Sequence, residues 1–291
     1  MRLFLDPDFL ASLAAKNRKR YANAQPFPHV VLDGVLPEQA LDLALDNFPS
    51  VDSVVWKEYD NYHEVKLETQ GEERFGDTMS LLLYQFNSAP FLRFLEDLSG
   101  VRPLIPDPYF AGGGLHQIAR GGKLGVHADF SGHWKLPLRR RLNVIVYLNR
   151  DWEDEYGGHL ELWDADTASC AKKIAPIYNR MVIFTITDRA LHGHPEPLAC
   201  PVGTTRKSIA LYYFTASPTG HATSATEHST IFVQRPGEVL AEDATLSRED
   251  GTSVKRDRLK TATATGRAKQ LVRRITPPVL FDAVRAIRRR G

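Results

Sequence analysis

Between about residues 109 and 216 the chain consists of short β-type segments separated by turn residues, and no other feature constrains the fold as strongly. Glycine, proline and asparagine stand between the segments, as an all-β barrel or sandwich requires. Several segments are rich in Val, Ile and Tyr, which favour strands. The expected strands are 114–119, 142–148, 159–163, 180–185 and 208–215.

The first hundred residues have a mixed character. Helical patterns are expected up to about residue 20, over 37–47 and over 91–98, while 25–32 reads as an extended segment interrupted by prolines. We therefore predict an N-terminal helical and mixed support segment over 1–100, packed on a core over 101–220 that is built from the β-type segments. The expected fold class is mainly β with flanking helices (α+β).

The C-terminal part, 221–291, is predicted to be a linker followed by a basic helical tail. Residues 247–291 hold 13 Lys or Arg against 4 Asp or Glu, a net charge of +9 that leaves −7 elsewhere. A basic tail can contact an anionic membrane surface or an acidic partner, and a solvated appendage is the simpler interpretation. We expect no sequence-specific binding of nucleic acid.

Composition and cysteine usage indicate a soluble protein in a reducing compartment. Hydrophobic residues make up 43% and charged residues 25% of the 291 residues, which are ordinary values for a globular protein. The two cysteines, Cys170 and Cys200, are too few for a disulfide scaffold. Asp6 and Asp8 interrupt the apolar N-terminus, and no run reaches the ~20 apolar residues of a membrane helix. We expect a cytoplasmic location.

A candidate metal site begins with His127-Ala128-Asp129. In an extended segment the imidazole and the carboxylate, two residues apart, point to the same side of the chain. A lone His-x-Asp is common by chance, but His192-Gly193-His194 follows another predicted strand. Two histidines and one carboxylate form the facial triad of non-heme iron oxygenases, which leaves coordination positions open for a bidentate ligand and dioxygen.

Further motifs lie in order between and after these ligand candidates. Tyr147-Leu148-Asn149 is followed by Asp151-Trp152, then by Gly157-Gly158-His159-Leu160, then by the histidines and by Arg206. Over about 109–216 this order and spacing resembles the prolyl 4-hydroxylase-like 2-oxoglutarate/Fe(II)-dependent dioxygenase family. The resemblance implies a double-stranded β-helix (jelly-roll) core that holds iron inside one open end.

The resemblance also implies roles for individual residues. His127 and Asp129 would bind iron. The third ligand would be His192, which follows Leu191 as in the family motif, while His194 stands nearer the usual distance from the arginine and remains the alternative. Arg206 would bind the distal carboxylate of 2-oxoglutarate together with Tyr147. Leu160 would pack on the cosubstrate, and Gln117 would reach the cosubstrate or substrate.

The resemblance implies oxidative decarboxylation of 2-oxoglutarate by dioxygen, giving succinate and CO2, coupled to hydroxylation of a C–H bond. Ascorbate is a further candidate cofactor. Asp129 fills a position that halogenating relatives leave open for chloride, so hydroxylation is favoured. Candidate substrates are a prolyl residue in a peptide or protein, a small molecule, or a glycan or lipid precursor. We expect residues 50–85 and 130–140 to select among them, and the candidates are Tyr59, Tyr62, Trp134 and the basic cluster Arg139-Arg140-Arg141.

Two other classes of function fit parts of the sequence. A cupin-like protein that binds a metal or a sugar without oxidation shares the barrel but has no need of Arg206 and Tyr147. An interaction protein that docks through its basic tail does not explain the set of ligand candidates and arginine.

Deletion of residues 247–291 is expected to leave iron binding intact, because every candidate ligand precedes residue 216. Metal content of the purified truncated chain checks this prediction. Loss of metal from a folded truncated protein would show that the tail belongs to the catalytic unit.

Overall fold

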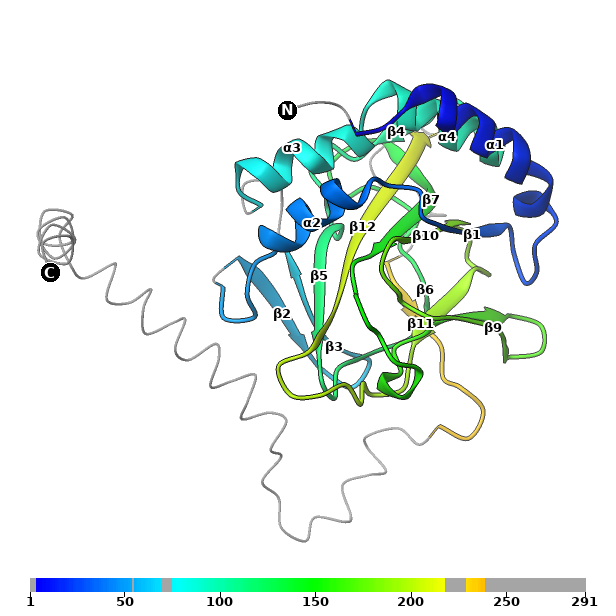
Figure 1. The fold of residues 1–291 in the computed structure, drawn as a ribbon. Coiled ribbons are helices and arrows are strands. Elements are labelled where there is room, and N and C mark those ends of the chain that lie inside the picture. Colours follow the sequence, from blue (N-terminus) through cyan, green and yellow to red (C-terminus); the bar gives the residue numbers. More distant parts are fainter. Residues whose placement is uncertain (1–3, 54, 70–74, 218–228, 239–291) are drawn as a thin grey trace, which may run out of the picture.

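The computed structural model describes residues 4–53, 55–69, 75–217 and 229–238 (Figure 1). The expected basic helix and most of the expected linker lie outside the described residues. The division into 1–100, 101–220 and 221–291 therefore stays a prediction.

One antiparallel sheet curls through the described residues and supplies most of the fold (Figure 1). Its strand order is β1-β10-β7-β12-β5-β3-β6-β11-β8-β9, with β2 beside β3, β4 beside β12 and β13 beside β6. The strands are β1 (His29–Asp33), β2 (Trp56–Asp60), β3 (Glu64–Thr69), β4 (Ile105–Pro106), β5 (Gly114–Ala119), β6 (Lys123–Ala128), β7 (Leu138–Tyr147), β8 (Leu160–Asp164), β9 (Ser169–Ile174), β10 (Arg180–Thr185), β11 (Leu191–His194), β12 (Thr205–Ala216) and β13 (Ile231–Phe232).

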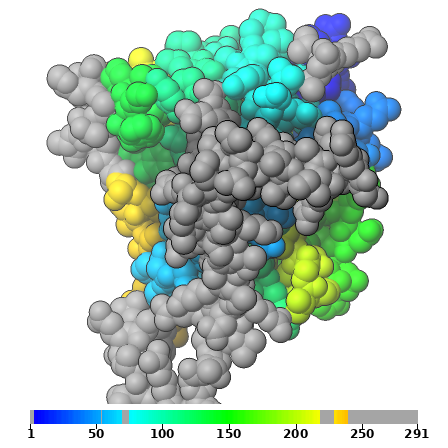
Figure 2. Space-filling view, turned by 90° about the vertical axis from the view of Figure 1, so that its left-hand side faces the viewer, coloured from blue at the N-terminus to red at the C-terminus, as the bar shows by residue number. Residues whose placement is uncertain are grey.

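In the described part of the chain, four α-helices cover part of the sheet: α1 (Pro7–Ala22), α2 (Glu38–Asp46), α3 (Asp77–Phe86) and α4 (Ala89–Ser99). Helix α1 begins at Asp6, whose side chain accepts hydrogen bonds from the backbone N–H groups of Asp8 and Phe9. Helix α4 ends at Gly100, which adopts a left-handed conformation with φ of 77°. Helices α3 and α4 lie along the upper edge of the molecule in both views (Figures 1 and 2).

The main hydrophobic core lies between these helices and the sheet. Strand β7 gives it Leu142, Val144 and Val146, and β12 gives it residues at the same alternation. Successive side chains of a strand point to opposite faces, so Asn143, Ile145 and Tyr147 point away from the helices. Because of this alternation, one face of the sheet packs against the helices and the other face is free to line a cavity.

The predicted fold class is confirmed, since the chain is mainly β with a curled antiparallel sheet and few helices. Strands were expected at 114–119 and 180–185, where β5 and β10 lie. The charged strands β2 and β3, which join the sheet from the N-terminal hundred residues, were not expected. No helix among the described residues has the length and apolar character needed to cross a membrane.

Candidate metal centre and its cavity

Two neighbouring strands bring His127, Asp129 and His192 together. His127 on β6 pairs directly with His192 on β11, and Asp129 follows the end of β6. One potential ligand atom from each of the three residues lies within 4.8 Å of the others, and all three residues are buried. The group therefore has the composition and spacing of a site for one metal ion.

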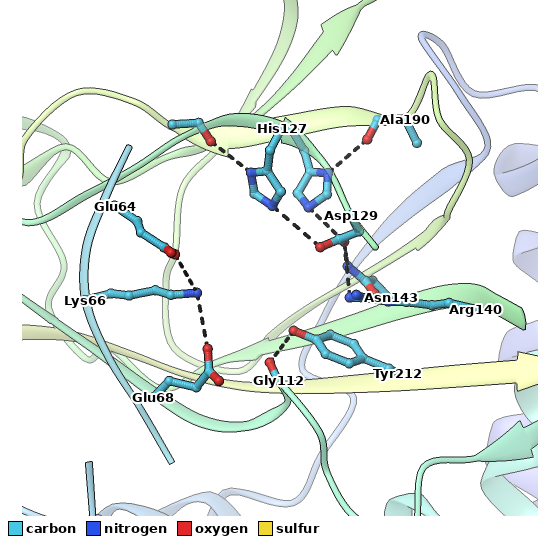
Figure 3. A network of polar contacts seen from close by, with 12 residues as sticks. Glu64, Lys66, Glu68, Gly112, His127, Asp129, Arg140, Asn143, Ala190 and Tyr212 are labelled. Atoms are coloured by element: carbon cyan, nitrogen blue, oxygen red, sulfur yellow. Dashed lines mark hydrogen bonds and ion pairs between the residues drawn. The ribbon is translucent and has the colours of Figure 1, made fainter. Parts of the chain in front are cut away.

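Backbone carbonyls orient both imidazoles. Nδ1 of His127 donates to the carbonyl oxygen of Gly125 at 2.8 Å, and Nδ1 of His192 donates to that of Ala190 at 2.9 Å. Because a carbonyl only accepts, these bonds place the proton on Nδ1 and leave each Nε2 free as a ligand atom. The Nε2 atoms lie 3.6 Å and 3.3 Å from the Asp129 carboxylate oxygens (Figure 3).

Arg140 and Asn143 both contact the Asp129 carboxylate and hold it in place (Figure 3). Asn143 Nδ2 donates to Asp129 Oδ2 at 2.7 Å, and Arg140 Nη2 lies 3.1 Å from the same oxygen. The buried guanidinium lies 3.4 Å from the ring centroid of Tyr212 and 4.3 Å from that of Phe130. These contacts occupy Oδ2 and leave Oδ1 facing His127.

The protonation states of Asp129 and His127 favour the binding of a metal cation. Burial opposes ionisation of Asp129, but the charges of Arg140 and His192 and the contacts with the histidines hold the pKa of its carboxyl well below the usual value. Burial, and next the proximity of His192, lower the pKa of His127, although Asp129 partly offsets both. A carboxylate and a neutral imidazole are the forms that bind a metal ion.

Replacement of Arg140 by methionine is expected to lower iron(II) affinity about 10- to 100-fold, the range typical of residues that support metal ligands. The substitution removes the cation that holds Asp129 and leaves the carboxylate uncompensated. Anaerobic iron titration measures the effect. Arg139→Met is the matched control, because Arg139 is exposed on the opposite face of β7; equal affinities in both variants would contradict the role of Arg140.

The metal group opens into a cavity of about 230 Å³. Arg206 lies in its wall and is buried, with Nε donating to the Gly158 carbonyl at 2.8 Å and Nη2 donating to the Tyr147 hydroxyl at 3.1 Å. No carboxylate among the described residues lies within ion-pair distance of this guanidinium. Burial lowers the pKa of Arg206, and Tyr147 partly offsets this. The cavity thus offers a buried cation to an anionic ligand.

Two glycines allow the close approaches on which this arrangement depends. A Cβ on Gly158, whose φ is +71°, would lie 2.9 Å from Cδ of Arg206, so a side chain there would displace the arginine. A Cβ on Gly193 would lie 2.6 Å from the Gly125 carbonyl oxygen and would separate β11 from β6.

His194 lines the same cavity but lies outside the metal group. The pairing of β11 with β6 shifts register between His192 and His194, and His194 lies opposite Leu124. Neither ring nitrogen of His194 has a hydrogen-bond partner among the described residues, and the side chain is buried. Burial, with the nearby charges of Arg206 and Lys66, holds its pKa well below the usual value.

The remaining predicted residues lie at or near the cavity. Leu160 lines it, and Tyr147 reaches it through Arg206. Gln117 is not among the lining residues, since its side chain donates to Thr205 Oγ1 at 2.8 Å. Its neighbour His116 lines the cavity instead. Trp134 is 67% exposed and does not line the cavity, whereas Tyr59 does.

Sequence reasoning missed several residues of the cavity and its support. Arg140 was noted only as part of a basic cluster, and Asn143 only as part of a predicted strand. Strand alternation places Asn143 on the same face as Tyr147, and that signal was present in the sequence. Glu64, Lys66 and Glu68 were also missed, because their strand was not expected, although they alternate with Val65 and Leu67 as strand residues do.

Comparison with known proteins agrees with this geometry. Residues 113–214 match the family model described as the 2OG-Fe(II) oxygenase superfamily. The matched region spans β5 to β12 and includes the strands that carry His127 and His192. Iron(II) and 2-oxoglutarate are the cofactor and cosubstrate of the superfamily, and dioxygen is its second cosubstrate.

Several solved structures are similar to this chain at low sequence identity. A prolyl hydroxylase from Trichoplax adhaerens, in complex with a peptide fragment of hypoxia inducible factor, has a TM-score of 0.53 at 18% identity, over 71% of this chain and 91% of that chain. A carbocyclase from nogalamycin biosynthesis has a TM-score of 0.49 at 15% identity, over 72% and 88%. A prolyl 4-hydroxylase from Phytophthora capsici has a TM-score of 0.45 at 18% identity, over 75% and 70%. No curated protein matches the sequence.

Proposed function

We propose that this chain is an iron(II)/2-oxoglutarate-dependent dioxygenase that hydroxylates an unactivated C–H bond, with release of succinate and CO2. One observation carries the proposal: the metal group and the buried, unpaired Arg206 line the same cavity. A metal-binding protein without oxygenase activity has no need of a buried cation in the same cavity as its metal ligands.

His127, Asp129 and His192 are the proposed iron ligands. Together they would hold the ion through one imidazole nitrogen each from the histidines and one carboxylate oxygen, and would leave coordination positions for a 2-oxo acid and dioxygen. His192 is preferred to His194 because its Nε2 faces Asp129, whereas the nitrogens of His194 lie outside the group.

Arg206 is the proposed partner of the distal carboxylate of 2-oxoglutarate. A guanidinium can donate two parallel hydrogen bonds to a carboxylate, and a buried one binds more strongly because the local dielectric constant is low. The Tyr147 hydroxyl, already bonded to Arg206, orients the guanidinium and can donate its own proton to the carboxylate.

Bound iron(II) and 2-oxoglutarate would supply the oxidising chemistry, and the chain supplies position and exclusion of water. Ile118, Ile145 and Leu160 line the cavity with apolar surface. Arg140 and Asn143 hold the Asp129 carboxylate in place. A prolyl residue in a peptide is the substrate suggested by the family resemblance and by the names of the prolyl hydroxylases with a related fold.

Anaerobic titration of the purified protein with iron(II) and 2-oxoglutarate tests this function. We expect the weak visible charge-transfer band of an iron–2-oxo acid chelate, and succinate when dioxygen is admitted. A folded, iron-loaded protein that shows neither would not be an oxygenase of this kind, and a cupin-like binding protein would then be the better interpretation.

A further inference from the structure

Three charged side chains of β3 form one wall of the cavity. Glu64, Lys66 and Glu68 alternate along the strand, so all three point to the same side, and all three line the cavity. Figure 3 shows them across the cavity from His127 and Asp129. We call these three residues the β3 wall.

The β3 wall belongs to the interior of the site and not to the solvated surface. Strand β3 is held between β5, where Glu68 pairs with His116, and β6, where Glu64 pairs with Leu124. The side chains of Glu64, Lys66 and Glu68 are 13%, 11% and 6% exposed. Charges this far from water need partners within the cavity.

The wall carries one more negative charge than positive. Lys66 Nζ lies 3.2 Å from Glu64 Oε2 and 3.3 Å from Glu68 Oε2. A single ammonium group therefore forms ion pairs with two carboxylates. The Tyr59 hydroxyl donates to Glu68 Oε1 at 3.3 Å, while no partner of Glu64 Oε1 is found among the described residues. Burial, and next the charges of Glu68 and Glu64, raise the pKa of Tyr59.

Unpartnered nitrogens beside the wall also indicate a missing ligand. Both ring nitrogens of the buried His194 and Nε2 of His116 lack partners among the described residues, and both residues line the cavity. Burial lowers the pKa of His116 to about 4, so its ring is neutral and adds no positive charge to offset the wall. The cavity thus has a cationic site at Arg206 and a wall with an excess of hydrogen-bond acceptors.

We propose that the primary substrate presents a protonated amine to the β3 wall, bound by Glu64 and Glu68. The proposal rests on the proposed function, because Arg206 is then occupied by 2-oxoglutarate and the substrate must meet the rest of the cavity. An ammonium group supplies three hydrogen-bond donors and one positive charge, which together satisfy the free acceptors and the excess carboxylate. An anionic group at the same place would be repelled by two buried carboxylates.

Binding of small, size-matched compounds tests this substrate class. The protein is loaded anaerobically with iron(II) and saturating 2-oxoglutarate, and the chelate band is followed during titration with pentylamine, pentan-1-ol, pentanoate and N-acetylprolinamide at neutral pH. We expect pentylamine to bind at least about tenfold more tightly than the other three. One buried charge pair is sufficient to produce a tenfold difference in the dissociation constant.

Variants of the β3 wall test which of its residues cause the preference for the amine. Glu64→Gln and Glu68→Gln should each reduce the preference for the amine about tenfold, since both keep the shape and remove a charge. Lys66→Met should bind pentylamine at least as tightly as the unmodified protein, because a competing ammonium is gone. Glu153→Gln is the control: it removes an exposed carboxylate outside the cavity and should change nothing.

The outcomes separate this proposal from the proposed function. An intact chelate band with equal binding of all four compounds, tighter binding of any of the other three, or no binding of any would overturn the amine proposal. So would an amine preference that survives in both glutamine variants. Absence of the chelate band in the unmodified protein would instead refute the oxygenase function itself.

Discussion

Replacing His127 by alanine is expected to abolish iron(II) binding and 2-oxoglutarate turnover. The imidazole supplies one of three ligand atoms that lie within 4.8 Å of one another, and two ligands cannot form the facial arrangement. The expected fall in iron affinity exceeds about 100-fold, the upper range for residues that only support ligands. Metal content after anaerobic loading and succinate formation measure the two effects.

The two histidines of β11 provide the matched pair for this experiment. His192→Ala should lose iron as His127→Ala does, whereas His194→Ala should retain it, because the His194 nitrogens lie outside the metal group. His159→Ala, which alters a histidine bonded to the exposed Asp154, is the control for folding. Retention of iron in His192→Ala together with its loss in His194→Ala would reverse our assignment.

Replacing Arg206 by alanine is expected to raise the dissociation constant of 2-oxoglutarate about 30-fold or more and to leave iron binding nearly unchanged. Removing one partner of a buried, hydrogen-bonded charge pair costs about 2 kcal/mol or more. No other cationic residue was found in contact with the Tyr147 hydroxyl in the described part of the chain, so none replaces the guanidinium. Titration of the chelate band with 2-oxoglutarate gives the constant directly.

Two milder variants distinguish charge from geometry at this site. Arg206→Lys keeps the charge but loses the planar fork, and should fall between the alanine variant and the unmodified protein. Tyr147→Phe removes one hydrogen bond and should weaken binding several-fold, by about 1 kcal/mol. An unchanged constant in Arg206→Ala with normal iron binding would place the cosubstrate elsewhere.

Local sequence patterns predicted strands that face an apolar core, and they failed for strands whose inward residues are charged. Strand β10 was found at its predicted residues because its side chains are mostly buried and apolar. Strand β3 was missed although Val65 and Leu67 alternate with Glu64, Lys66 and Glu68, a pattern that reads as a short segment with one face in solvent rather than a strand of the core. Its inward side faces a polar cavity, and hydrophobic patterning cannot report that.

The sequence also could not determine which of two neighbouring residues lines the cavity. The family resemblance implied that Gln117 reaches the cosubstrate or substrate, yet His116 lines the cavity and Gln117 bonds to Thr205. Adjacent residues of a strand point to opposite faces of the sheet, so an error of one position assigns the wrong residue to the cavity. Only the pairing of β5 with β12 and β3 determines which face is inward.

The sequence alone determined the fold class, the oxygenase resemblance and the residue types of the candidate metal ligands, because each depends on residue type and short spacing. His127 and Asp129 are two residues apart in an extended chain, and that spacing suffices to place them on one side. The tertiary structure decided which histidine completes the group, since His192 meets His127 only through the register of β11 on β6. It also decided that β3 brings charges to the cavity, because pairing between distant segments depends on the packing of the whole sheet.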